Sequence, residues 1–146
     1  MATDKVYVGK LIMNKFKMIA AALASTVAFA SPVFAEWTKV DENVNGNTYY
    51  IDYGTVKENN GYVYYWYLAD YLKPTKFGDL SAKVLSEVDC DIPRKVRGLS
   101  YAYYTQPMAS GGTSGGNNNT EREWYYPEPN TLGEYMINAV CDYAGK

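Results

Sequence analysis

The sequence predicts an α+β domain in which a disulfide bond ties a C-terminal helix to one face of an antiparallel sheet. Three observations lead to this fold class. Segments that alternate apolar and polar residues are separated by turns rich in Gly and Asn. Residues 130–146 have helical periodicity, and the only two cysteines lie one in a strand-like segment and one in this helical segment.

Residues 1–35 have the order of a secretory signal peptide. Met13–Lys17 carries two lysines, Met18–Ala30 is uncharged, and the segment ends in small side chains. We expect cleavage after Ala35, with Ala30 as the alternative, and Met13 is an alternative to Met1 as the start of translation. The 13 uncharged residues fall short of the about 20 that span a bilayer, so no stable membrane insertion is expected after cleavage. The residue directly after the predicted cleavage site is not a cysteine, which a lipoprotein would need to carry its lipid.

Residues 36–146 form the predicted mature domain, and this domain is acidic. The chain has 14 Lys and Arg against 16 Asp and Glu, and the leader takes away four lysines and one aspartate, which leaves a net charge of -5. Binding to nucleic acid is therefore not expected. The chain has no histidine, which excludes Ser-His and Cys-His nucleophile pairs and histidine metal sites.

Five segments of the mature chain are predicted to be strands, with turns at residues 44–47 and 59–61. The longest is apolar or aromatic on both faces, which favours a central strand. Leu80–Cys90 alternates so that Lys83, Glu87 and Asp89 share the polar face while Cys90 points into the core. The five segments are Trp37–Asp41, Thr48–Tyr53, Tyr62–Leu72, Leu80–Cys90 and Lys95–Thr105.

Residues 108–123 contain the run GGTSGGNNNTERE, which has too little apolar surface to offset the entropy of ordering it. We expect a flexible Gly/Asn-rich loop there, either a connector or a binding loop.

Residues 130–146 are predicted to form a helix that begins with a capping box of Thr131 and Glu134 and ends at Gly145. Because the chain is predicted to be exported and has only two thiols, Cys90 and Cys141 are expected to form a disulfide that ties this helix to the sheet. The chain-entropy model gives such a bridge about 4 kcal/mol. The predicted apolar stripe consists of Tyr135, Met136, Ala139, Val140 and Tyr143.

Several strings in the mature chain together resemble the surface-adhesin protein E family of bacteria. They are Tyr49-Tyr50-Ile51-Asp52, the Asp89-Cys90 pair with the basic segment after it, and the C-terminal run VCDYAGK at residues 140–146. The similarity spans most of residues 36–146. It implies about six strands, with the helix on the concave face, so the expected sheet has five to six strands. It also implies binding to host extracellular-matrix or plasma proteins.

Two basic regions are candidate ligand-binding sites. Arg94, Lys95 and Arg97 form the only dense basic cluster, to which a polyanion or an acidic partner could dock; the alternative is an ordinary solvated strand edge. The family resemblance implies a ligand-binding basic pair before the cysteine-bearing strand, and the nearest residues here are Lys73 and Lys76.

Carboxylates give no strong prediction of catalysis or metal binding. Asp89 and Asp91 flank Cys90, but no glycine turn or distal glutamate completes a calcium loop. Asp52, Asp70 and Asp79 would form an acid/base site only if two of them converged in a pocket. We therefore predict no catalytic residue, no metal and no cofactor.

The resulting functional hypothesis is an exported, non-enzymatic binding domain, located in the periplasm or at the cell surface. A periplasmic structural protein without a host ligand is the alternative, and a small envelope enzyme is the third interpretation. Adhesion itself rests on the family resemblance, because one scaffold can serve unrelated functions.

Overall fold

The computed structural model describes residues 35–119 and 122–146, and Ala35–Lys146 forms one compact unit. The predicted signal peptide up to residue 34 and the alternative start at Met13 lie outside the described residues. They remain predictions.

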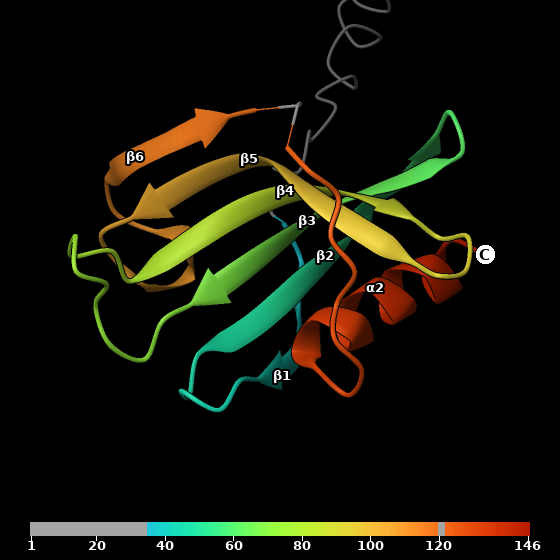
Figure 1. The fold of residues 1–146 in the computed structure, drawn as a ribbon. Helices are drawn as coiled ribbons and strands as arrows, with labels where there is room; N and C mark the ends of the chain where they lie inside the picture. Colours follow the sequence, from blue (N-terminus) through green and yellow to red (C-terminus); the bar gives the residue numbers. More distant parts are fainter. Residues whose placement is uncertain (1–34, 120–121) are drawn as a thin grey trace, which may run out of the picture. The chain divides into compact units, whose positions relative to one another are not determined.

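The described residues form six strands, one short 3-10 helix and one α-helix (Figure 1). The strands are hydrogen-bonded in chain order, each antiparallel to the next, so the sheet is a simple meander. This arrangement confirms the predicted fold class and makes the segment that begins at Tyr62 an interior strand. The elements are β1 (Trp37–Glu42), β2 (Thr48–Asn59), β3 (Tyr62–Asp70), β4 (Ser81–Asp89), β5 (Lys95–Tyr104), η1 (Pro107–Ala109), β6 (Thr113–Asn118) and α2 (Leu132–Tyr143).

The main core lies between α2 and the face of the sheet that it covers. Alternate residues of the strands point toward the helix, and both Val63 of β3 and Val88 of β4 are fully buried. The helix places four buried side chains against them. The cluster consists of Ile51, Val63, Tyr65, Val88, Cys90, Val96, Met136, Ile137, Val140 and Cys141.

The stripe predicted for the helix is partly wrong. Tyr135 and Tyr143 are each 60% exposed, whereas Ile137 is buried. The side of the helix that packs against the sheet is instead formed by Met136, Ile137, Val140 and Cys141, the buried residues of α2. The ring of Tyr143 instead packs at the rim of the core, with its centroid 4.9 Å from that of Tyr53.

Both ends of α2 are capped as the sequence predicts. The Thr131 hydroxyl accepts a hydrogen bond from the Glu134 amide, and the Glu134 carboxylate accepts one from the Asn130 amide at 2.8 Å. At the other end Gly145 has a φ of 75°. The Lys146 amide reaches back to the Cys141 carbonyl, which is the Schellman pattern.

Cys90 and Cys141 form the predicted disulfide bond. It joins the residue that follows β4 to the last turn of α2, across 51 positions in sequence. The fold therefore has the covalent link between sheet and helix that the two cysteines predict.

Residues 108–123, predicted as a flexible loop, are not a loop throughout, because Thr113–Asn118 forms the edge strand β6. All six of its residues are exposed, so backbone pairing with β5 orders it rather than apolar burial. Gly116 allows the close approach, since a Cβ there would collide with the Tyr101 carbonyl oxygen. The Ser114 hydroxyl also donates to the buried carboxylate of Asp79.

Candidate functional site

The helix side of the sheet contains a cavity of about 900 Å³ lined by five tyrosines. It lies beside the N-terminal half of α2 and is bordered by the end of β1 and by residues that precede the helix. The five are Tyr49 from β2, Tyr65 and Tyr67 from β3, Tyr125 from the segment before α2, and Tyr135 from α2.

The strand alternation that builds the core also builds the floor of this cavity. Tyr65 and Tyr67 are two residues apart on β3 and so point to the same side, with ring centroids 6.0 Å apart. Tyr49 on the neighbouring strand lies 6.3 Å from Tyr67. Tyr65 is 2% exposed and forms the deepest part, whereas Tyr135 at the rim is 60% exposed. The cavity thus runs from a buried aromatic floor to an accessible aromatic rim.

Four tyrosines of the cavity, Tyr49, Tyr65, Tyr67 and Tyr125, stay uncharged under physiological conditions. Burial raises the pKa of Tyr49, Tyr65 and Tyr125, and it raises the pKa of Tyr67 well above its ordinary value. A ligand would therefore meet flat apolar rings with neutral hydroxyl groups.

Tyr125 is placed by a short extension of the sheet. Its backbone exchanges two hydrogen bonds of 3.0 Å with Val96 of β5, so the segment around Tyr125 continues the pairing along the edge of β5. Further along β5, the rings of Tyr101 and Tyr103 stack with centroids 6.5 Å apart. The Arg122 guanidinium lies 4.3 Å from the centre of the Tyr101 ring. Aromatic surface therefore continues beyond the cavity.

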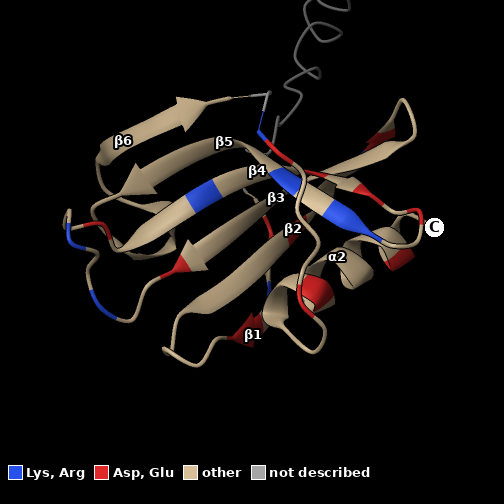
Figure 2. Ribbon diagram, in the orientation of Figure 1, with Lys and Arg blue, Asp and Glu red and all other residues tan. Residues whose placement is uncertain are grey.

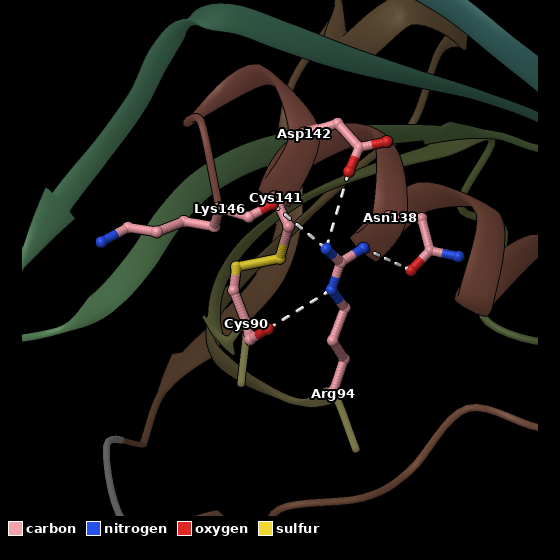
Figure 3. Close-up of polar contacts among 6 residues, drawn as sticks. All are labelled: Cys90, Arg94, Asn138, Cys141, Asp142 and Lys146. Carbon is pink, nitrogen blue, oxygen red and sulfur yellow. Dashed lines mark hydrogen bonds and ion pairs between the residues drawn. A yellow bond between two sulfur atoms is a disulfide. The ribbon is translucent and has the colours of Figure 1, made fainter. Parts of the chain in front are cut away.

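Arg94, the first residue of the predicted basic cluster, is bound to the end of the helix (Figure 3). Its guanidinium donates to the Asn138 side chain at 2.8 Å and to the Lys146 carbonyl at 3.3 Å. Its Nε donates to the carbonyl of Cys90 at 3.4 Å, and Asp142 lies 3.6 Å away. Arg94 thus connects the β4–β5 turn to α2 beside the disulfide.

Lys95 and Arg97 lie on the opposite face of the sheet from the core and also have internal partners. Arg97 donates to Glu87 at 2.5 Å and lies 4.6 Å from the centre of the Trp124 ring. Lys95 pairs with Asp89 at 3.4 Å and lies 5.2 Å from the same ring. Figure 2 accordingly shows the basic segments of β5 next to acidic ones. The sequence did not distinguish Arg94 from Lys95 and Arg97, although Arg94 is the residue of the three that contacts the helix.

Glu87 lies on the face opposite the core, as the alternation predicts, yet it is only 3% exposed, and Arg97 and the Tyr64 hydroxyl both donate to its carboxylate. The alternative interpretation of this region, a solvated strand edge, is corrected for this part of β5. The strand lies between β4 and β6, and Tyr125 continues the pairing at Val96.

Lys73 and Lys76 lie in the β3–β4 connection, away from the other basic residues, and both are exposed. The Lys76 ammonium is 4.9 Å from the centre of the Phe77 ring, which is itself 78% exposed. Within the described part of the chain, neither lysine forms an ion pair. The five predicted basic residues therefore do not form one surface.

The three carboxylates considered for acid/base chemistry do not converge. Asp52 accepts from the Gly54 amide, Asp70 from the Met108 amide, and Asp79 from the Thr75 and Ser114 hydroxyls. None of the three lines the tyrosine cavity or the second cavity, of about 730 Å³, on the other face.

Among residues 35–119 and 122–146, no group of three His, Cys, Asp or Glu side chains is arranged to hold a metal ion. The same residues include no helix with the length and hydropathy of a membrane-spanning segment.

Sequence reasoning missed the tyrosine cavity. The composition points to tyrosine as an interface residue without indicating which tyrosines gather. The signal that could have found part of the site is the alternation of Tyr49 with Ile51 and of Tyr65 with Val63, which places each tyrosine on the core side. The contribution of Tyr125 depends on an isolated bridge that leaves no pattern in the sequence.

The comparisons with known proteins agree with this fold. The family model for surface-adhesin protein E matches residues 37–142. One solved structure of Haemophilus influenzae protein E has a TM-score of 0.57 at 15% identity, over 78% of this chain and 90% of that chain. Its crystal form II has a TM-score of 0.55 at 18% identity, over 78% and 93%. No curated protein sequence matches. The family match extends over most of the chain, which therefore belongs to the surface-adhesin protein E family.

Proposed function

We propose that the domain is an exported, non-enzymatic surface adhesin that binds a protein partner through the tyrosine-lined cavity. The observation that carries the proposal is the cavity of about 900 Å³ with five tyrosines between the sheet and α2. Tyrosine is enriched in the energetically dominant part of protein interfaces, because it buries a large rigid ring and keeps a hydrogen-bonding group. Family membership supports the adhesin role.

The scaffold suits this role because it holds the cavity on rigid elements. The floor belongs to β2 and β3, and the disulfide and the Arg94 contacts fix the far end of α2. A preorganised site loses less conformational entropy on binding than a mobile loop does. Host extracellular-matrix or plasma proteins are the partners that the family membership favours.

The basic residues support a second, weaker candidate function, binding to a polyanion. Lys73 and Lys76 are exposed and have no ion pair among the described residues, so both charges are available. Arg94, Lys95 and Arg97 would have to give up internal contacts before they could bind a ligand. A heparin column distinguishes the two regions, since replacing Lys73 and Lys76 with Ala should reduce retention without lowering the melting temperature.

The proposal is tested first by location. An antibody against the domain should label intact cells that express the full chain. Labelling only after permeabilisation of the outer membrane would contradict surface display and support the periplasmic alternative.

The binding surface is tested with two tyrosine variants of the purified domain. Tyr135 lines the cavity and Tyr126 does not, yet both are 60% exposed, so they form a matched pair. Matrix and plasma proteins are immobilised, and those that retain the wild type are tested again. Tyr135→Ala should weaken that binding about tenfold, within the range for interface tyrosines, while Tyr126→Ala should not. Equal effects of the two variants would contradict the cavity as the binding surface.

A further inference from the structure

The charged side chains that line the tyrosine cavity are all acidic. Three carboxylates line it, those of Asp41, Glu42 and Glu134, and no lysine or arginine does. Asp41 and Glu42 come from the end of β1, and Glu134 comes from the first turn of α2. Acidic groups thus border an aromatic floor from two different elements.

In each of these carboxylates one oxygen has a hydrogen-bond or ion-pair partner, and the other oxygen has none among the described residues. One Asp41 oxygen accepts from the Glu42 amide, one Glu42 oxygen pairs with Lys39, and one Glu134 oxygen accepts from the Asn130 amide. Three fixed but incompletely used acceptors therefore remain at the rim.

Two neighbouring features oppose a cationic ligand. The N-terminus of α2 borders the cavity and carries a partial positive charge, and the Lys39 ammonium is 2.7 Å from Glu42. The helix end contributes only about half a charge, and its first turn already contains the full negative charge of Glu134. Lys39 offsets one carboxylate, so the cavity keeps an excess of negative charge from Asp41 and Glu134.

We propose that this cavity binds an arginine or lysine side chain from an extended basic segment of a partner protein. This inference rests on the proposed function, because it names the chemistry that the tyrosine cavity selects. The aliphatic stem and the cationic head would lie against the tyrosine rings, and the head would donate hydrogen bonds to the rim carboxylates. Arginine is favoured over lysine because its planar guanidinium can stack on a ring and donate to a carboxylate at the same time.

The domain uses the same combination within its own fold. Arg97 lies over the Trp124 ring while it donates to Glu87, and Arg122 lies over the Tyr101 ring. In both cases the guanidinium stacks on an aromatic ring, and in the first a carboxylate completes the contact. The tyrosine cavity supplies rings and carboxylates but no cation of its own.

The test uses the purified domain and two peptides of equal shape. The probe is acetyl-Gly-Gly-Arg-Gly-Arg-Gly-Gly-amide, and its counterpart has citrulline in place of both arginines, which removes the charge. Titrations followed by amide NMR should move the signals of Gly133 and Tyr135, which line the cavity. The arginine peptide should bind at least tenfold more tightly, and raising the salt concentration should weaken it.

Variants assign the effect to the rim. Asp41→Asn and Glu134→Gln should each weaken binding of the arginine peptide several-fold, and Glu134→Gln keeps a side chain able to cap the helix. Asp91→Asn changes the net charge equally, but Asp91 is exposed in the β4–β5 turn and does not line the cavity, so this control should bind as the wild type does.

The outcomes separate this inference from the proposed function. Equal binding of both peptides, or equal effects of Asp41→Asn and Asp91→Asn, would overturn cation selection. If partner proteins still depend on Tyr135 in that case, the cavity remains the binding surface and only its selectivity for cations is wrong. If Tyr135→Ala has no effect on partner proteins while the arginine peptide binds through the rim, the cation site stands and the adhesin surface lies elsewhere.

Discussion

Removal of the disulfide should cost a large part of the stability of the domain. The double variant Cys90→Ala with Cys141→Ala avoids leaving a free thiol. The bridge closes a loop across 51 positions, which corresponds to about 4 kcal/mol in the chain-entropy model. Domains of this size have unfolding free energies of about 5–15 kcal/mol. The variant should therefore stay folded at low temperature but with a much smaller margin.

The loss should also be local to α2 before it is global. A 12-residue helix is marginally stable in isolation, and α2 would then be held mainly by Met136, Ile137 and Val140. Urea unfolding followed by circular dichroism gives the total loss, and amide hydrogen exchange shows whether α2 opens below the global transition. The reduced wild type should behave as the variant does. A loss below about 1 kcal/mol, or unchanged exchange in α2, would refute the reasoning, since a loop of this length should contribute several times more.

Three further predictions follow from contacts around the sheet. Arg94→Ala should lower the unfolding free energy by about 1.5–3 kcal/mol, the range for hydrogen bonds to charged groups, and Arg94→Lys should restore little; urea unfolding within 0.5 kcal/mol of the wild type would contradict this. The hydrogen bond that the Tyr64 hydroxyl donates to Glu87 raises the pKa of Tyr64 from 10.0 to about 12. The stability that this bond gives the wild type over Tyr64→Phe should therefore be constant below pH 10, because Tyr64 is then protonated in both the folded and the unfolded state. The difference should shrink as the pH rises toward 12. Measured denaturation curves that keep the same difference at both pH values would be inconsistent with that bond. Gly116→Val should detach β6, seen as lost hydrogen-exchange protection there, with little change in the amides of β2 and β3.

Much of the fold could be predicted because its signals are local. Each signal depends on a short stretch of sequence. These signals are the alternation around Val84 and Val88, the capping residues Thr131 and Glu134, and the predicted leader, which indicates an oxidising compartment for the two cysteines. They give the interior strands, the helix ends and the bridge. In a meander each strand pairs with its neighbour in the chain, so little non-local information is needed to order the sheet.

The remainder depends on contacts between distant segments. The edge strand at Thr113–Asn118 has no apolar alternation, and it is ordered by pairing with β5 and by Ser114 donating to Asp79. Arg94 and Arg97 are neighbours in a basic run, yet one contacts the helix and the other lies on the opposite face beside Trp124. The density of basic residues along the sequence therefore suggested one basic surface, but the fold places Arg94 at the helix and Arg97 on the opposite face of the sheet.

The bridge between Cys90 and Cys141 also determines how the domain would carry a mechanical load. A pulling force applied at residues 35 and 146 passes along the chain to Cys90, crosses to Cys141 and leaves by the last few residues. At about 3.4 Å per residue, the extended length is about 210 Å instead of about 380 Å without the bridge. β5, β6 and most of α2 lie outside the path of the force, so a force that detaches β1 would not stretch them.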